Sequence, residues 1–82
     1  MNQKIFTMNL GVEAVSLYLL CCAVADSGSA ITKNALRDKW NGSPAALDRE
    51  LDTLEKRGIV RRDDTFAPEA PAYLLMAEKF WH

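Results

Sequence analysis

The fold is decided by residues 43–62, which read SPAALDRELDTLEKRGIVRR. Ser43 can cap the start of a helix, and Pro44 suits its first position, where a missing N–H costs nothing. The apolar residues that follow recur at i, i+4 and i+7: Leu47, Leu51 and Leu54. Gly58 can adopt the left-handed conformation that ends a helix. This pattern predicts an amphipathic helix over residues 44–57.

A second helix is predicted just upstream, over residues 33–40. Thr32 is a suitable N-cap, and Leu36 and Trp40 are spaced i, i+4, so they face the core together. The turn at 41–42 contains a glycine, which tolerates positive φ and ends the helix. Two helices joined by a short turn with a glycine are typical of a helix-turn-helix.

A first helix is expected over residues 10–25, with Asn9 or Thr7 as its cap. Its apolar residues point in nearly every direction, which is typical of a helix that is buried all round. A chain of 82 residues has too little material to cover such a helix alone. The sequence therefore predicts a homodimer, formed through this helix and the C-terminal segment.

The residue pattern changes after Gly58. Residues 59–62 are β-branched and then basic, which predicts a short strand, and residues 72–76 can return as its partner. The residues between them have loop composition, including Thr65. We expect a β-hairpin over residues 59–76. The tail, which carries Phe80 and Trp81, is expected to dock on the domain or on a second subunit.

The order of these elements, together with LDTLEKRGIVRR at residues 51–62, resembles the winged helix-turn-helix superfamily of bacterial transcription factors. In that family the end of the recognition helix often reads Leu-x-x-Leu-Glu-x-x-Gly-Leu-Ile and is followed by a charged strand. The resemblance covers residues 10–76. The usual Tyr-x-Leu-Thr-x-x-Gly ending is replaced here by YLLMAEK at 73–79.

The resemblance implies one α+β, mainly α, domain over residues 1–82: three helices, a two-stranded hairpin called the wing, and a short C-terminal segment. It also implies a sequence-specific double-stranded DNA-binding protein, a transcriptional regulator, which reads the major groove with the third helix and the backbone with the wing. Such a regulator is expected in the cytoplasm.

The candidate DNA contacts follow from the geometry of the third helix. With its leucines facing inward, about 100° per residue places Ala45, Arg49, Asp52 and Lys56 on the opposite side. Small alanines allow close approach to a thymine methyl, and an arginine reaches a guanine edge. Polar residues of the second helix and the wing are expected to contact phosphates. The candidate residues are Lys33, Asn34, Arg37, Ser43, Pro44, Ala45, Ala46, Arg49, Thr53, Arg61, Arg62 and Thr65.

The distribution of charge along the chain favours DNA binding in part. The net charge is −1, but residues 30–62 hold eight Lys and Arg against five Asp and Glu, a local balance of +3. Four acidic residues lie on the third helix itself, and Asp52 falls on its exposed side, where it would repel phosphate. The alternative is a solvated face with i, i+4 pairs such as Asp52–Lys56. The alternative function is a winged-helix protein-interaction module that does not bind DNA.

Several other functions are not expected. The sequence has no cluster of nucleophile, base and orienting group, so we do not expect an enzyme or a cofactor. The single histidine, His82, and the two cysteines, Cys21 and Cys22, form no metal-binding pattern. The adjacent cysteines are expected to be small core residues, with a redox link between two chains as the alternative. The apolar segment at 10–25 is too short to cross a bilayer, and no small-molecule ligand is expected.

Overall fold

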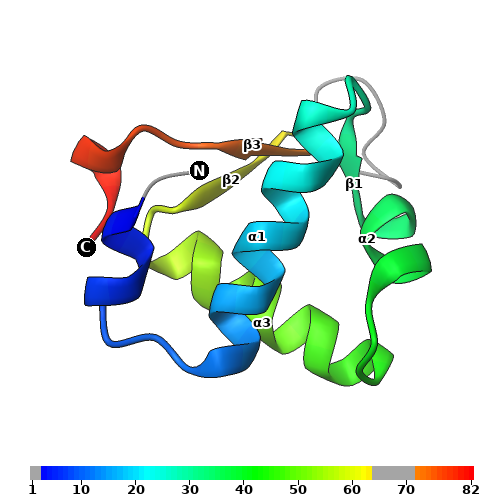
Figure 1. Cartoon of the computed structure of the whole chain (residues 1–82), viewed down its shortest axis with the longest axis horizontal. Helices are drawn as coiled ribbons and strands as arrows, with labels where there is room; N and C mark the ends of the chain where they lie inside the picture. The colour runs from blue at the N-terminus through cyan, green and yellow to red at the C-terminus, as the bar shows by residue number, and fades with distance from the viewer. Residues whose placement is uncertain (1–2, 64–71) are drawn as a thin grey trace.

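The computed structural model describes residues 3–63 and 72–82, which form a small, mainly helical α+β domain (Figure 1). Within these residues there are three α-helices, a three-stranded antiparallel sheet and two short 3₁₀ helices. Their bounds, in chain order, are η1 (Gln3–Thr7), α1 (Val12–Asp26), β1 (Ile31–Thr32), α2 (Lys33–Lys39), α3 (Pro44–Lys56), β2 (Val60–Asp63), β3 (Ala72–Leu75) and η2 (Glu78–Phe80).

All three predicted helices are present, with bounds that differ by one or two residues. The predicted caps of α2 and α3 are confirmed. The Thr32 hydroxyl oxygen accepts a hydrogen bond from the amide of Ala35, and the Ser43 hydroxyl oxygen accepts one from Ala46, each at 3.1 Å. Gly58 has a φ of 71°, as the expected left-handed end of α3 requires.

The prediction for the start of α1 was wrong. Its N-cap is Gly11, which has no side chain to accept a hydrogen bond, and its carbonyl accepts the amide of Val15 at 3.1 Å. The Thr7 hydroxyl instead donates to the carbonyl of Lys4 at 2.8 Å within η1. Asn9 has a φ of 60°, a turn conformation that asparagine tolerates better than most residues. Thr7 and Asn9 therefore belong to the turn before α1, and neither caps the helix.

The sheet confirms the predicted hairpin and adds a strand. β2 and β3 pair antiparallel, with Val60 opposite Leu75. β1, which the sequence analysis did not foresee, pairs with the other edge of β3, so the order is β1-β3-β2. A two-residue strand is too short to show the alternation of polar and apolar residues by which strands are recognised. The hairpin loop, with Thr65, lies outside the described residues.

The core lies between α1, α3 and the sheet. Its largest fully buried side chains are Ile5, Leu17, Leu36, Leu47, Leu54, Ile59 and Val60. In Figure 1, α1 crosses in front of α3, and β3 runs toward the upper end of α1. Within one chain the first helix is not covered all round, because Val12 is 83% exposed and Leu19 is 36% exposed. One face of α1 packs into the core and the opposite face lies on the surface.

Both terminal segments dock on this domain near the end of α3. Trp81 packs edge-to-face on Tyr18, with ring centroids 5.6 Å apart at 81°, so this part of the tail folds back on its own chain. The Arg57 guanidinium donates to the carbonyl of Met8 at 3.0 Å and to the carbonyl of His82. Arg57, which directly follows the last residue of α3, therefore joins the two segments.

Candidate nucleic-acid interface

The two sides of α3 differ as the sequence predicts. Its three leucines are at most 3% exposed, so the helix is held firmly against the core. Ala45, Arg49, Asp52 and Lys56 are all exposed on the opposite side. The expectation that this far side stays open is confirmed for every one of the four residues.

The start of α3 is fixed by the turn before it. The indole N–H of Trp40 donates to the carbonyl of Ser43 at 3.1 Å, which ties the end of α2 to the cap of α3. A Cβ at Gly42 would lie 2.7 Å from the Trp40 indole nitrogen, so the turn needs glycine for this close approach. Ser43, Pro44 and Ala45 are exposed and Ala46 is partly buried. The residues expected to approach bases are therefore held in one geometry.

The polar residues of α2 differ in their surroundings. Lys33 is partly buried, and its ammonium group forms a salt bridge of 3.0 Å with Asp48 of α3. Asn34 and Arg37 are exposed. Arg37 has no ion pair within the described part of the chain, so its charge is available to a phosphate. Lys33 reaches a phosphate only by giving up Asp48.

Arg49 on α3 is paired with two carboxylates. Its guanidinium lies 3.0 Å from the carboxylate of Glu50 and 3.3 Å from that of Glu13 on α1. The hydrogen bond and charge of Glu50, and then the charge of Glu13, raise the pKa of Arg49. The hydroxyl of Thr53 is turned back toward the helix, donating to the Arg49 carbonyl at 3.1 Å.

The pair that the sequence offered as an alternative to DNA contact is also present. The ammonium group of Lys56 lies 2.9 Å from the carboxylate of Asp52, one turn earlier on α3. This hydrogen bond and the charge of Asp52 raise the pKa of Lys56. The solvated-face reading is therefore correct for Lys56 in the free protein.

The two arginines of the hairpin point to opposite faces of the sheet. Arg61 pairs with Leu74, and both are exposed on the outer face. Arg62 lies opposite Tyr73, which is buried, so Arg62 projects from the edge of the inner face. The sequence analysis expected both arginines to contact DNA from the wing. Because neighbouring strand residues alternate, their side chains leave the strand on opposite faces of the sheet.

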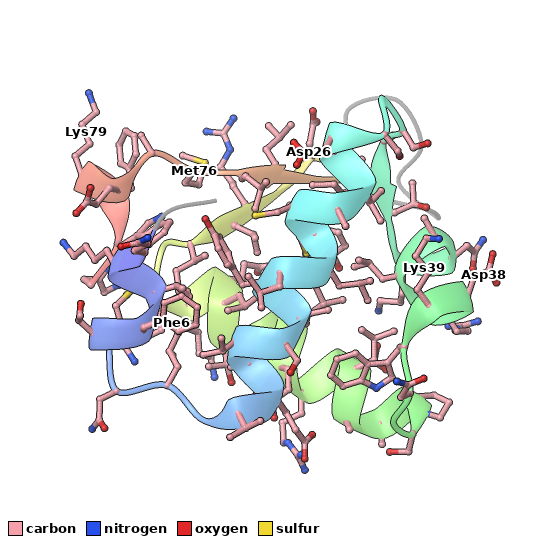
Figure 2. All side chains as sticks on the ribbon, in the orientation of Figure 1. Phe6, Asp26, Asp38, Lys39, Met76 and Lys79 are labelled. Carbon is pink, nitrogen blue, oxygen red and sulfur yellow. The ribbon has the colours of Figure 1, made fainter. Side chains whose placement is uncertain are left out.

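An open groove of about 830 Å³ lies between α1 and the turn that joins α2 to α3. Leu19, Leu20 and Trp40 contribute to its apolar lining, and Arg49 and Lys39 to its polar lining. The sequence analysis did not single out Lys39, because nothing in its spacing shows that it borders a groove. Figure 2 places Lys39 and its neighbour Asp38 at one end of the molecule and Lys79 at the other.

The structure thus gathers some of the predicted contacts and separates others. Ser43, Ala46 and Arg49 border the same groove. The hairpin arginines come from a different element, and Thr65 cannot be placed. Within the described residues, the cations with neither an ion pair nor a carbonyl or ring partner are Arg37, Lys39, Arg61 and Arg62.

Comparison with known proteins gives no further lead. No protein family, no curated protein and no solved structure matches the chain. In residues 3–63 and 72–82, no helix combines the length and apolar character that a membrane crossing requires. The same residues contain no group of three or more His, Cys, Asp or Glu that could hold a metal ion.

Proposed function

We propose that this chain is a winged-helix protein that binds double-stranded DNA and regulates transcription. The observation that carries the proposal is the arrangement of α3: its apolar side is fully buried, its far side is fully open, and a hairpin with two arginines follows it directly. A helix held in this way can enter the major groove without losing its own packing.

In the proposed complex, the start of α3 faces the bases. Ala45 and Ala46 allow close approach to thymine methyl groups, and Arg49 reaches a guanine edge. The cation Arg37 on α2 and Arg61 on β2 contact phosphates, which fixes the orientation of the domain on the duplex. Because Arg61 and Arg62 project from opposite faces, we assign the phosphate contact on the outer face of the sheet to Arg61 alone.

To bind DNA, some cations of α2 and α3 would have to exchange a carboxylate of the same chain for a DNA group. Arg49 must leave Glu13 or Glu50 to reach a base, and Lys33 must leave Asp48 to reach a phosphate. The pairs of Lys33 with Asp48 and of Arg49 with Glu13 join exposed or partly exposed groups, which interact weakly in water. Exchange of these partners is therefore feasible, but the lost ion pair reduces the free energy gained from each DNA contact. We expect weak binding to unrelated DNA and tighter binding to the correct sequence.

A fluorescence-anisotropy titration with mixed-sequence duplex DNA at two salt concentrations tests the proposal. We expect affinity to fall as salt rises, because phosphate contacts release counterions. Arg37→Gln and Arg61→Gln should each weaken binding to all sequences and reduce the salt slope by about 1. Lys79→Gln is the control: it removes one positive charge from η2, which the proposed complex does not use, and should change neither the affinity nor the salt slope (Figure 2).

Absence of binding at low salt, or an equal loss in the Lys79→Gln control, would refute the proposal. The first outcome favours the second candidate, a winged-helix module that binds another protein. The observation on its side is that Lys33, Arg49 and Lys56 are all neutralised by carboxylates of the same chain. Such pairing reduces the positive potential that would attract DNA.

A further inference from the structure

The two carboxylates that contact Arg49 differ in burial and in origin. The side chain of Glu50 is 14% exposed, whereas that of Glu13 is 56% exposed. Glu50 follows Leu47 by three residues and precedes Leu54 by four, so it lies on the flank of the buried side of α3. Glu13 belongs to the first turn of a different helix, α1. Glu50 is therefore a fixed neighbour of Arg49, and Glu13 is a hydrated one.

The two carboxylates also use different N–H groups of the Arg49 guanidinium. The Nε–H donates to Glu50 at 3.0 Å, and Nη2 donates to Glu13 at 3.3 Å. Within the described part of the chain, Nη1 has no partner. An arginine reads the O6 and N7 atoms of guanine with two donors of its planar fork, and Nη1 and Nη2 form one such pair. Guanine can therefore be read while Nε stays bonded to Glu50.

We propose that Glu50 is a positioning residue for guanine recognition: it keeps its hydrogen bond to Nε and turns the Nη1–Nη2 edge of Arg49 toward the base, while Glu13 is released. The inference rests on the proposed DNA binding and names the base that α3 selects. A guanidinium that is already held in place loses less freedom when it binds.

The difference in burial explains why the two acids have opposite roles. If Arg49 left Glu50, a carboxylate with little access to water would lose its partner, which is costly. Glu13 is exposed, so water replaces Arg49 at little cost. The hydrogen bond and charge of Glu50 also raise the pKa of Arg49 more than the charge of Glu13 does. Both observations make Glu13 the partner that a base displaces.

Binding measurements with matched variants test this role. A preferred duplex is first selected from a random library with wild-type protein, and each of its G·C pairs is then replaced in turn by A·T. We expect one replacement to weaken wild-type binding at least about fivefold in the anisotropy assay. Glu50→Met keeps the length of the side chain but removes the acceptor, and it should lose most of this preference. Its affinity for mixed-sequence DNA should not fall, because a negative charge has been removed.

Three further variants separate positioning from charge. Glu50→Gln retains an acceptor oxygen and should keep most of the preference for G·C. Glu13→Gln should keep the preference in full. Glu55→Met is the matched control, because it makes the same change at an exposed residue of α3 that has no ion pair within the described residues. It should leave the preference unchanged.

A second readout follows the Arg49 Nε–H directly by NMR, without DNA. Its signal should exchange slowly with water in wild type and in Glu13→Gln, and it should be lost in Glu50→Met. In the complex with the preferred duplex, the wild-type signal should persist. Loss of this signal on DNA binding would overturn the inference, because Glu50 would then have released Arg49.

The outcomes distinguish this inference from the proposed function. The inference fails, and DNA binding stands, if wild type prefers no G·C pair, if Glu50→Met keeps the preference, or if Glu55→Met loses it equally. Absence of DNA binding by wild type at low salt refutes the proposed function and the inference together, even where the NMR signal shows Glu50 holding Arg49.

Discussion

Two glycines of this chain provide a matched test of how the C-terminal segment is held. Gly28 and Gly58 both have positive φ, 84° and 71°, so alanine is strained at either position. A Cβ at Gly28 would meet nothing within 4 Å, whereas a Cβ at Gly58 would overlap the carbonyl oxygen of Phe80. Gly28→Ala therefore measures the backbone cost alone. Gly58→Ala measures the same cost together with displacement of the tail.

The expected magnitudes follow from this difference. The left-handed conformation costs alanine roughly 1–2 kcal/mol, so both variants should lose at least this much stability. In Gly58→Ala the tail must also move, which removes Trp81 from its place on Tyr18. Loss of one large buried side chain costs about 1.5–3 kcal/mol more. In a domain of this size, each kcal/mol lowers Tm by about 4–8 °C.

Thermal melts followed by circular dichroism, with urea unfolding as a check, measure both variants against wild type. We expect Gly58→Ala to melt at least about 6 °C below Gly28→Ala. Its near-ultraviolet spectrum should also lose the signal of the Tyr18–Trp81 contact, while that of Gly28→Ala is retained. Equal Tm values and equal spectra would show that the tail does not pack against the end of α3.

Three further variants test the local chemistry. Ser43→Ala removes the cap of α3 and should cost about 1 kcal/mol in urea unfolding; an unchanged midpoint would contradict the hydrogen bond to the helix. Glu13→Gln frees Arg49 from one of its carboxylates and should strengthen DNA binding roughly two- to fivefold in the anisotropy assay, whereas weaker binding would argue against a DNA contact by Arg49. Burial raises the pKa of the Cys21 thiol from 9.0 to about 12, with a smaller contribution from Cys22. In the unfolded chain the thiol ionises at its usual pKa, so the stability due to the neutral buried thiol is complete well below pH 9 and falls as pH rises toward 12. The loss is about 1.4 kcal/mol at pH 10, and Cys21→Ala should not show it.

The helices could be predicted because their signals are local. Thr32, Ser43 and Gly58 act within a few residues of their own position, and each has the predicted role. The start of α1 was missed for a related reason. A cap is recognised from a polar side chain, and the residue in that position is Gly11. β1 was missed because its two residues form a strand only by pairing with β3, some forty positions later in the sequence.

The candidate site was less accessible to sequence reasoning. The exposed side of α3 follows from helical periodicity and was predicted correctly. Helical periodicity does not show which cations are already paired, because Lys33–Asp48 and Arg49–Glu13 join different helices. The pair Lys56–Asp52 was foreseen, since it lies within one helix at i, i+4. The groove beside Trp40 depends on how α1 packs against the turn, and no local pattern reports that packing.

The pattern of paired and unpaired cations has a consequence for how this domain would recognise DNA. The charges of α3 are largely compensated within the chain, whereas Arg37 and Arg61, on its neighbours, are not. Phosphate attraction would then come mainly from α2 and β2, and α3 would contribute discrimination between sequences. With so few uncompensated cations, one copy would hold DNA weakly at physiological salt. Arg37→Gln and Arg61→Gln combined should therefore lower the salt slope by about 2, whereas Arg49→Gln should mainly reduce the preference for the correct sequence.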